Sequence, residues 1–412
     1  MSDPESVASA TGGRRMRVLY ITGGFPYPLT SGYLRHYHLI RGLSSRHDID
    51  LVSIVGRSFQ MEHVEGIRPF VKRVEPVRAV GRSRSRAVKA ARRVTDAVLH
   101  AGSTGTSRAL AQSARRLVAE TSYDAVVLSG RETEAVLAEI REIPLVVDLC
   151  DATASRLIGS LPHSSPLRRA MIRLELIRVR RIESELAAAG RHLLFASVRD
   201  RDLVLDGAHA SKAVVVPNGV DIEFWQRRQP RLGEERVVFS GAMNYRPNED
   251  AALYLIREIM PRVWASEPTT QLSIVGREPT AALIRAASDL RVTVTGFVSD
   301  MRPHLESGAA FVAPLRFGAG IQNKLLEAMA MEMPIITSAV AAAGVTVDEH
   351  PVPVVVARDA PGFAAETIAA VRAVRKDPTP RAEARRYVAR QFTWDAAVET
   401  LDRVLVRTAV PG

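Results

Sequence analysis

The chain has 412 residues, of which 46% are hydrophobic and 25% charged, values typical of a globular protein. This length exceeds what one hydrophobic core supports and predicts two α/β domains of about 200 residues each. The single cysteine, Cys150, excludes an intramolecular disulfide and an all-cysteine metal site and favours a reducing compartment, while an aromatic content of 5% argues against a stacking platform for single-stranded nucleic acid.

The first strand is predicted at Met16–Thr22, where apolar and β-branched residues precede Gly23 and Gly24. A proline-containing loop follows, and helical apolar spacing begins after Gly32 and runs to Leu43. The residues before this strand, 1–15, are polar and small, and we expect them to form a disordered tail. The sequence therefore predicts a first domain that opens with a strand, a glycine turn and a helix.

Further strands are expected in the first half of the chain, separated by stretches long enough for helices. They are Ile49–Val55, Tyr123–Leu128, Pro144–Leu149, His192–Ser197 and Ala213–Val216. This alternation implies βαβ units and a largely parallel sheet. Arg35, His36 and His38 would lie early in the first helix. The two histidines are two residues apart and face different sides of it, which argues against joint metal binding.

Much of the formal net charge of +11 comes from two segments, Arg68–Arg93 and Arg168–Arg181. In the second, apolar residues alternate with arginines on an expected helix, which makes it a basic amphipathic element. Anionic lipid, acidic acceptors or nucleic acid would be drawn to it, but no zinc-finger spacing or RNA-binding aromatic signature supports nucleic acid. A solvated helix face is the alternative. Around Gly81–Gly105 we expect a mobile connection.

A turn at Pro217–Gly219 and a polar stretch up to Glu235 mark the expected domain junction, with the first domain at residues 16–222 and the second at 223–392. Strands of the second domain are expected at Arg236–Ser240, Gln271–Val275, Val292–Thr295, Ala310–Ala313 and Pro334–Thr337, and helices near Asn248, Ala281 and Met301. In doubly wound sheets ligands collect at the carboxyl ends of the strands, which here means the cleft between two facing domains.

The segment Phe311–Pro334 carries the strongest functional signal. An apolar strand ends in a glycine turn, and helical apolar spacing then resumes. The first N–H groups of such a helix are unpaired and suit a phosphate. Arg316, Lys324 and Glu327 could converge there on a phosphorylated sugar or a nucleotide. The alternative is an ordinary connection with two solvated charges.

Six segments, taken in order, resemble the retaining GT-B glycosyltransferases of glycosyltransferase family 4, which use nucleotide-sugar donors. They are GGFPYPLTSG near the start, VVVPNGVDIEFW at the junction, FSGAMNYRPNEDAALYLI, LSIVG, VTGFV, and the strand–turn–helix segment that ends in KLLEAMAMEMPII. The resemblance covers both domains. It implies two Rossmann-like domains, with the donor bound mainly by the second and the acceptor mainly by the first. It also implies retention of configuration and no bound metal.

The resemblance assigns Glu327 to the donor ribose hydroxyls. The first glutamate of the family's usual pair is replaced by Ala319, and the usual Arg and Lys after Gly241 are displaced. Neutralisation of the diphosphate is therefore expected from Lys324 first, with Arg316 and Arg246 as weaker candidates. The glycine turn and helix start would supply backbone N–H groups to the donor; these residues are Gly318, Gly320, Ile321 and Gln322.

In the first domain, Gly23 and Gly24 would let the backbone approach the donor phosphates, although a plain turn competes. On the acceptor side we expect Gly32, which would place a helix N-terminus near the reaction centre, with Arg35 and His36. Asp151 is the candidate for orienting the acceptor hydroxyl, and otherwise it caps the helix that follows it.

Other functions remain open. They are a nucleotide-sugar epimerase or hydrolase of the same architecture, a non-catalytic nucleotide-sugar-binding scaffold, and a dinucleotide-dependent oxidoreductase, for which a third glycine is missing at Asn323. Residues 393–412, including Trp394, are expected to form a helix that returns to the first domain. The expected location is the cytoplasm, with peripheral contact at an anionic inner membrane face, and the acceptor is unknown.

Overall fold

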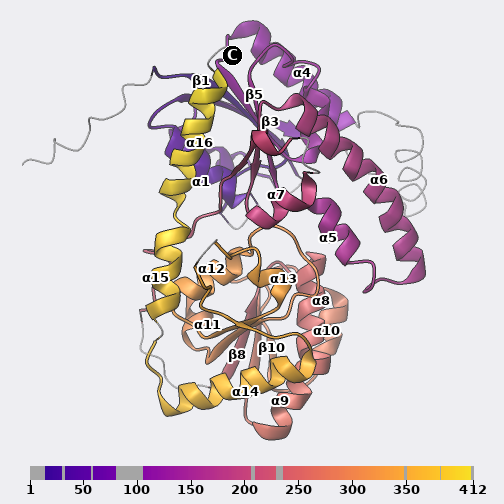
Figure 1. Cartoon of the computed structure of the whole chain (residues 1–412), viewed down its shortest axis with the longest axis vertical. Coiled ribbons are helices and arrows are strands. Elements are labelled where there is room, and N and C mark those ends of the chain that lie inside the picture. The colour runs from indigo at the N-terminus through magenta and orange to yellow at the C-terminus, as the bar shows by residue number, and fades with distance from the viewer. Residues whose placement is uncertain are drawn as a thin grey trace, which may run out of the picture.

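The computed structural model describes residues 14–29, 33–56, 59–79, 105–205, 209–228, 235–347, 350–380 and 382–409. They form two lobes, each a parallel sheet with helices packed on both faces, stacked one above the other (Figure 1). The predicted architecture of two doubly wound α/β domains is confirmed. Most of the expected tail, Gly32, and residues 81–104 of the expected basic connection lie outside the described residues.

The first domain contains a seven-stranded sheet in the order β3-β2-β1-β4-β5-β6-β7. Its strands are β1 (Arg17–Thr22), β2 (Asp48–Val55), β3 (Arg73–Arg78), β4 (Ala125–Ser129), β5 (Leu145–Cys150), β6 (His192–Phe195) and β7 (Ala213–Val215). Strand β3 was not predicted. It is an edge strand that buries only Val77 and contains Pro76, which an edge tolerates, so its sequence lacks the apolar run of its neighbours.

Helices cover both faces of this sheet. Those that precede β6 are α1 (Leu34–Leu43), α2 (Glu62–Glu65), η1 (Arg68–Phe70), α4 (Gly105–Glu120), η2 (Arg131–Val136), α5 (Thr153–Gly159) and α6 (Pro166–Ala189), and those after it are α7 (Val198–Val204) and η3 (Ala210–Lys212). Apolar residues of α1 pack on one face of the sheet, while those of α4 and α6 pack on the other.

The second domain contains a six-stranded sheet in the order β10-β9-β8-β11-β12-β13. Its strands are β8 (Arg236–Ser240), β9 (Gln271–Val275), β10 (Val292–Val294), β11 (Ala310–Ala313), β12 (Ile335–Thr337) and β13 (Val355–Val356). Its helices are α8 (Arg246–Tyr254), η4 (Leu255–Ile259), α9 (Met260–Ser266), α10 (Ala281–Ala286), α11 (Arg302–Glu306), α12 (Asn323–Ala330), α13 (Ala339–Ala342) and α14 (Ala360–Lys376). Strand β13 was missed because it is a two-residue exposed edge.

The last two helices, α15 (Ala382–Gln391) and α16 (Trp394–Ala409), lead from the second domain back to the first. In Figure 1, α16 runs beside α1 at the upper lobe. Leu401 and Leu405 are fully buried in the first-domain core, and the Trp394 ring stacks on His38 with 4.3 Å between ring centroids. Asp402 accepts a hydrogen bond from His47. The end of the chain therefore belongs structurally to the first domain.

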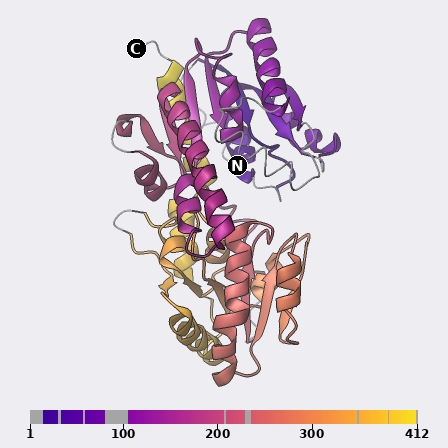
Figure 2. The same ribbon diagram turned by 90° about the vertical axis from the view of Figure 1, so that its right-hand side faces the viewer.

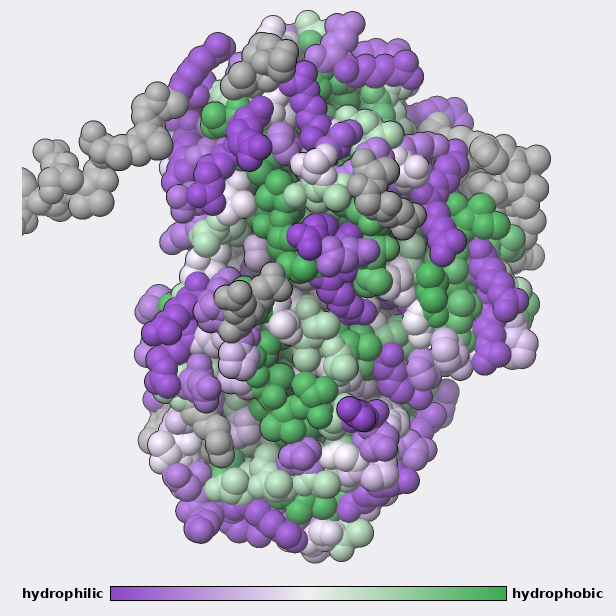
Figure 3. All heavy atoms as spheres, in the orientation of Figure 1, coloured by the Kyte–Doolittle hydropathy of each residue, from purple (hydrophilic) through white to green (hydrophobic). Residues whose placement is uncertain are grey.

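The predicted basic amphipathic helix is α6, which lies along the outer side of the upper lobe (Figure 2). Its buried apolar residues are Ile172 and Val179, which pack against α5, and Ile182, Leu186 and Ala187, which pack against the sheet. Leu167 and Ile177 point outward with exposed fractions of 76% and 60%. Figure 3 shows apolar and charged side chains side by side over this helix. No helix within the described ranges is long and apolar enough to span a bilayer.

Candidate active site

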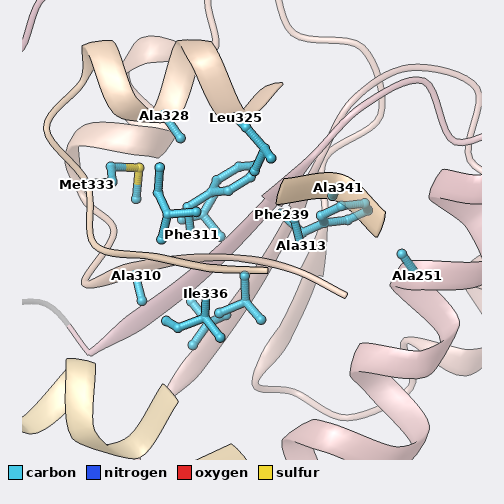
Figure 4. Close-up of a cluster of buried hydrophobic side chains, with 14 of the residues drawn as sticks. Phe239, Ala251, Ala310, Phe311, Ala313, Leu325, Ala328, Met333, Ile336 and Ala341 are labelled. Carbon is cyan, nitrogen blue, oxygen red and sulfur yellow. The ribbon is translucent and has the colours of Figure 1, made fainter. Parts of the chain in front are cut away.

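The carboxyl ends of β8, β9 and β11 meet at the start of α12. This helix is anchored by its apolar side, since Leu325 and Met329 are fully buried in the second-domain core. Figure 4 shows Leu325 in this core together with Phe239 and Phe311. The spacing that predicted the helix is therefore the spacing of its core contacts. Because the apolar side is fixed, Lys324 is held at the other side of the same turn.

Lys324 is 9% exposed, and its Nζ donates to Asn248 Oδ1 at 2.6 Å and to Gln322 Oε1 at 3.1 Å. Asn248 is itself fixed, since its Nδ2 donates to the carbonyl oxygen of Ala242 at 3.0 Å. Burial lowers the pKa of Lys324 to about 8, while the nearby Glu327 opposes this shift. The ammonium thus has only neutral acceptors, so a bound anion would be its first charged hydrogen-bond partner.

Glu327 lies one helical turn after Lys324 and is half-buried. Burial raises the pKa of its carboxyl group to about 7, and the charge of Lys324 opposes this shift. A carboxylate in such a place gains from hydrogen-bond donors such as sugar hydroxyls. The structure therefore places Lys324 and Glu327 together, as the sequence analysis proposed.

Two closely packed glycines, Gly241 and Gly276, lie beside Lys324. A Cβ on Gly241 would stand 2.5 Å from Asn248 Nδ2, and one on Gly276 would stand 1.8 Å from the carbonyl oxygen of Gly241. Both glycines have positive φ, +152° and +145°. Gly241 was a predicted donor-binding residue. Gly276 and Asn248 were missed, although the glycine that ends the strand segment LSIVG was a signal that could have found Gly276.

The glycine turn before α12 contacts the first domain. Gly320, with φ +71°, donates its backbone N–H to Asp200 Oδ2 at 3.1 Å. Asp200 lies at the start of α7 and also accepts from Ala152 N and Ser197 Oγ. One of the N–H groups proposed for phosphate is therefore bonded to a carboxylate across the domain boundary.

The other proposed members of the turn are mostly enclosed. Ile321 joins the second-domain core, and Gln322 Nε2 donates to the carbonyl oxygen of Ala319 while its Oε1 accepts from Lys324. A Cβ on Gly318 would stand 3.6 Å from Gln322 Nε2. The side chain of Gln322 thus supports both the turn and the ammonium.

Neither Arg316 nor Arg246 joins Lys324. The Arg316 guanidinium forms two hydrogen bonds with Asp250, at 2.8 and 2.6 Å. Arg246 donates to Ser164 Oγ of the first domain at 2.6 Å, and its guanidinium carbon lies 6.0 Å from the Phe317 ring centroid. Both arginines hold structural contacts here, so we withdraw them as groups that neutralise the diphosphate.

Asp151 lies at the domain boundary. Its Oδ1 accepts from Thr153 Oγ1 at 2.8 Å, and Arg131 lies 3.5 Å away. A Cβ on Gly320 would stand 3.3 Å from the Cβ of Asp151. The N-cap position of α5 is Ala152 and no side chain caps the helix, so the alternative role of Asp151 as a helix cap is wrong. Asp151 contacts the first residue of α5 and also borders the glycine turn of the other domain.

Gly23 and Gly24 make room for two side chains that sequence reasoning missed. A Cβ on Gly24 would stand 2.1 Å from the Tyr33 ring, and one on Gly23 would stand 3.0 Å from Glu132 Oε2. The Gly23 N–H donates to the carbonyl oxygen of Ser129 at 2.9 Å. The glycine pair therefore has a packing role, and Glu132 brings an exposed carboxylate to the carboxyl end of β4.

The assignment of Arg35 and His36 to the acceptor is corrected by their burial, at 4% and 5% exposed. Arg35 binds Asp148 at 2.8 Å and Asn218 at 2.9 Å. His36 lies between Tyr20 and Ser129, and burial lowers its pKa to about 4. Both side chains stabilise the first domain, because their hydrogen-bond partners belong to the first-domain sheet and to the turn after β7.

Asn218 continues this network across the boundary, since its Nδ2 donates to Asn323 Oδ1 at 2.9 Å. Asn323 is the first residue of α12. The buried ion pair of Arg35 and Asp148 is thus hydrogen-bonded through Asn218 to the helix that carries Lys324. Within the described residues, no three His, Cys, Asp or Glu side chains are grouped to share a metal ion.

Residues 234–373, which contain Gly241, Lys324 and Glu327, match the family model described as glycosyl transferases group 1. No curated protein matches the chain. The match covers the second domain and supports sugar transfer.

Solved structures match along nearly the whole chain. HepE of Anabaena in complex with UDP and glucose has a TM-score of 0.66 at 14% identity, over 95% of this chain and 99% of that chain. Sucrose-phosphate synthase of Thermosynechococcus elongatus has a TM-score of 0.66 at 15% identity, over 94% and 98%. A Listeria monocytogenes protein assigned as a UDP-N-acetylglucosamine 2-epimerase has a TM-score of 0.54 at 10% identity, over 97% and 98%. These likenesses show the GT-B fold that the sequence resemblance predicted.

Proposed function

We propose that this protein transfers a sugar from a nucleoside-diphosphate sugar to a hydroxyl group of an acceptor, with retention of configuration, as a member of glycosyltransferase family 4. The observation that carries the proposal is the pairing of a buried ammonium, Lys324, with a half-buried carboxylate, Glu327, one turn later at the strand ends of the second domain. A diphosphate and a ribose diol present matching groups to such a pair.

The chemistry requires a cation where the sugar leaves. Departure of a nucleoside diphosphate from the anomeric carbon builds negative charge on the phosphate oxygens. Lys324 and the dipole of α12 would stabilise that charge without a metal ion. In a retaining transfer the acceptor attacks from the face that the diphosphate leaves, and the leaving phosphate helps to remove the acceptor proton.

UDP-sugars are the first donor class to test. HepE of Anabaena was solved with UDP, with UDP-glucose, and with UDP and glucose, and its fold matches this chain over both domains. The acceptor is proposed only as a hydroxyl of a polysaccharide, a lipid-linked sugar or a small molecule.

The direct test is calorimetric titration of the purified protein with UDP, GDP, ADP and dTDP, followed by a product assay with the corresponding sugars. At least one diphosphate should bind, and Lys324→Ala should weaken its binding at least tenfold. Arg316→Ala is the matched control, because Arg316 lies in the same strand–turn–helix segment but is paired with Asp250. Failure of every diphosphate to bind would overturn the proposal.

The second candidate is a nucleotide-sugar epimerase or hydrolase of the same fold. Ala319 replaces the glutamate that the resemblance expects, and one structural neighbour is assigned as an epimerase. Incubation of the bound donor without an acceptor separates the two functions. A transferase should leave most of the donor intact, whereas an epimerase or hydrolase should convert it. Binding without turnover under any condition would identify a non-catalytic scaffold.

We also propose that α6 contacts an anionic membrane at the cytoplasmic face. Leu167 and Ile177 are exposed, and Arg173 and Arg178 lie among them. Basic residues near an anionic surface contribute about 1 kcal/mol each. Sedimentation with vesicles should recover the protein with phosphatidylglycerol but not with phosphatidylcholine alone, and the double variant Arg173→Gln, Arg178→Gln should lower the recovery. Equal recovery from both vesicle types would contradict this contact.

A further inference from the structure

The cations that sequence analysis expected around the diphosphate are engaged elsewhere. Arg316 is paired with Asp250, and Arg246 is bonded to Ser164. Of the three expected cations, Lys324 alone faces the proposed site, and it carries at most one charge because its pKa is lowered to about 8. A departing nucleoside diphosphate carries more than one negative charge. The proposed reaction therefore calls for a second cation.

Arg156 of α5 reaches the second domain from the first. Its guanidinium carbon lies 5.6 Å from the ring centroid of Tyr245. Tyr245 is the residue before α8, and its carbonyl oxygen accepts the backbone N–H of Asn248 at 2.9 Å. Asn248 in turn binds Lys324. Arg156 thus stands against the same short loop that positions the ammonium.

The guanidinium of Arg156 is not fully satisfied. Its Nε is buried and has no hydrogen-bond partner among the residues that the structure describes. Its Nη2 makes one long contact, 3.4 Å to Thr153 Oγ1, and no described carboxylate lies within ion-pair distance. An unpaired buried donor is costly. A guanidinium is also the side chain best shaped to bind a phosphate through two parallel N–H groups.

We propose that Arg156 binds the diphosphate of the donor and supplies the second positive charge from the first domain. This inference rests on the proposed function. The diphosphate would then lie between Lys324 of one domain and Arg156 of the other, so full stabilisation of the leaving group would require the two domains to be together. A chain of contacts leads from Arg156 to the glycine turn: Arg156 contacts Thr153, Thr153 Oγ1 donates to Asp151, and a Cβ on Gly320 would stand 3.3 Å from the Cβ of Asp151.

The test compares Arg156→Gln with Arg108→Gln, an exposed arginine of α4 in the same domain, so that both variants lose one charge. Each is titrated with the best-binding diphosphate of UDP, GDP, ADP and dTDP, and with the corresponding monophosphate and nucleoside. Arg156→Gln should weaken diphosphate binding at least tenfold, leave nucleoside binding unchanged, and keep the melting temperature of the unliganded protein. Arg156→Lys should restore part of the affinity.

Equal diphosphate affinity in the two glutamine variants would overturn the inference, as would an equal loss for the nucleoside, because damage to the fold would then explain it. If the wild type binds a diphosphate and Lys324→Ala weakens it while Arg156→Gln does not, this inference alone fails. If the wild type binds no diphosphate, the proposed function fails and the inference fails with it.

Discussion

Burial shifts the pKa values of two ionisable side chains of α12 so that each favours its uncharged form. The pKa of Lys324 falls to about 8 and that of Glu327 rises to about 7. The folded state therefore binds fewer protons than the unfolded chain between pH 8 and 10.5 at Lys324, and more between pH 4.5 and 7 at Glu327. Both shifts disfavour the fold most between pH 7 and 8, the range in which both groups are charged and a donor could use them.

We accordingly expect diphosphate affinity to be highest between about pH 7 and 8. It should fall above this range as Lys324 loses its proton. In Lys324→Arg the fall at alkaline pH should disappear, because a guanidinium stays charged. Calorimetric titration across pH 6 to 10 measures both effects, and an unchanged alkaline limb in Lys324→Arg would show that another group titrates.

Gly241 and Gly276 are packed too closely beside Lys324 to carry a side chain. In Gly276→Ala the new methyl group would meet the carbonyl oxygen of Gly241 at 1.8 Å in a backbone conformation of positive φ. We expect a loss of about 2 kcal/mol or more and weaker diphosphate binding. Gly56→Ala is the control, since nothing lies within 4 Å of its Cβ position. Thermal melting compares them, and equal melting temperatures would refute the tight contact.

At the scale of elements, the start of α7 and the glycine turn before α12 are joined through one carboxylate. Asp200→Ala would remove the acceptor of Gly320 N, Ala152 N and Ser197 Oγ. Each buried donor left unpaired costs about 1–3 kcal/mol, so the melting temperature should fall clearly. Asp202→Ala on the same helix removes an exposed carboxylate and should change little. A wild-type melting curve for Asp200→Ala would show that the turn does not depend on this contact.

At the scale of the whole molecule, α16 makes the first domain depend on the end of the chain. Leu401 is fully buried in the first-domain core, whereas Val406 on the same helix is 43% exposed. Leu401→Ala should cost about 2–5 kcal/mol and Val406→Ala less than about 1 kcal/mol. Removal of α16 before Trp394 should abolish activity through loss of the first-domain fold. Retention of activity after that truncation would contradict the packing.

Local patterns determined much of the fold. Apolar runs predict β1 and β11, and helical apolar spacing predicts α12. In each element the apolar residues of the pattern are the ones that the structure buries. The same patterns fail at β3 and β13. Both are edge strands that bury few side chains, so their sequences lack the apolar run of a central strand. The alternation of strands and helices was enough to predict two parallel sheets, because only βαβ connections satisfy it.

The sequence also brings together the residue types of the proposed diphosphate site, since Lys324, Glu327 and the glycine turn lie in one continuous segment. The hydrogen-bond partners of these residues come from distant parts of the chain. Lys324 meets Asn248 across 76 residues and Gly320 meets Asp200 across 120. Arg35 and His36 are buried against residues that are distant in the sequence: Asp148 lies 113 residues from Arg35, and Ser129 lies 93 residues from His36. Hydrogen-bond partners and burial depend on contacts between distant segments, and no local spacing encodes these.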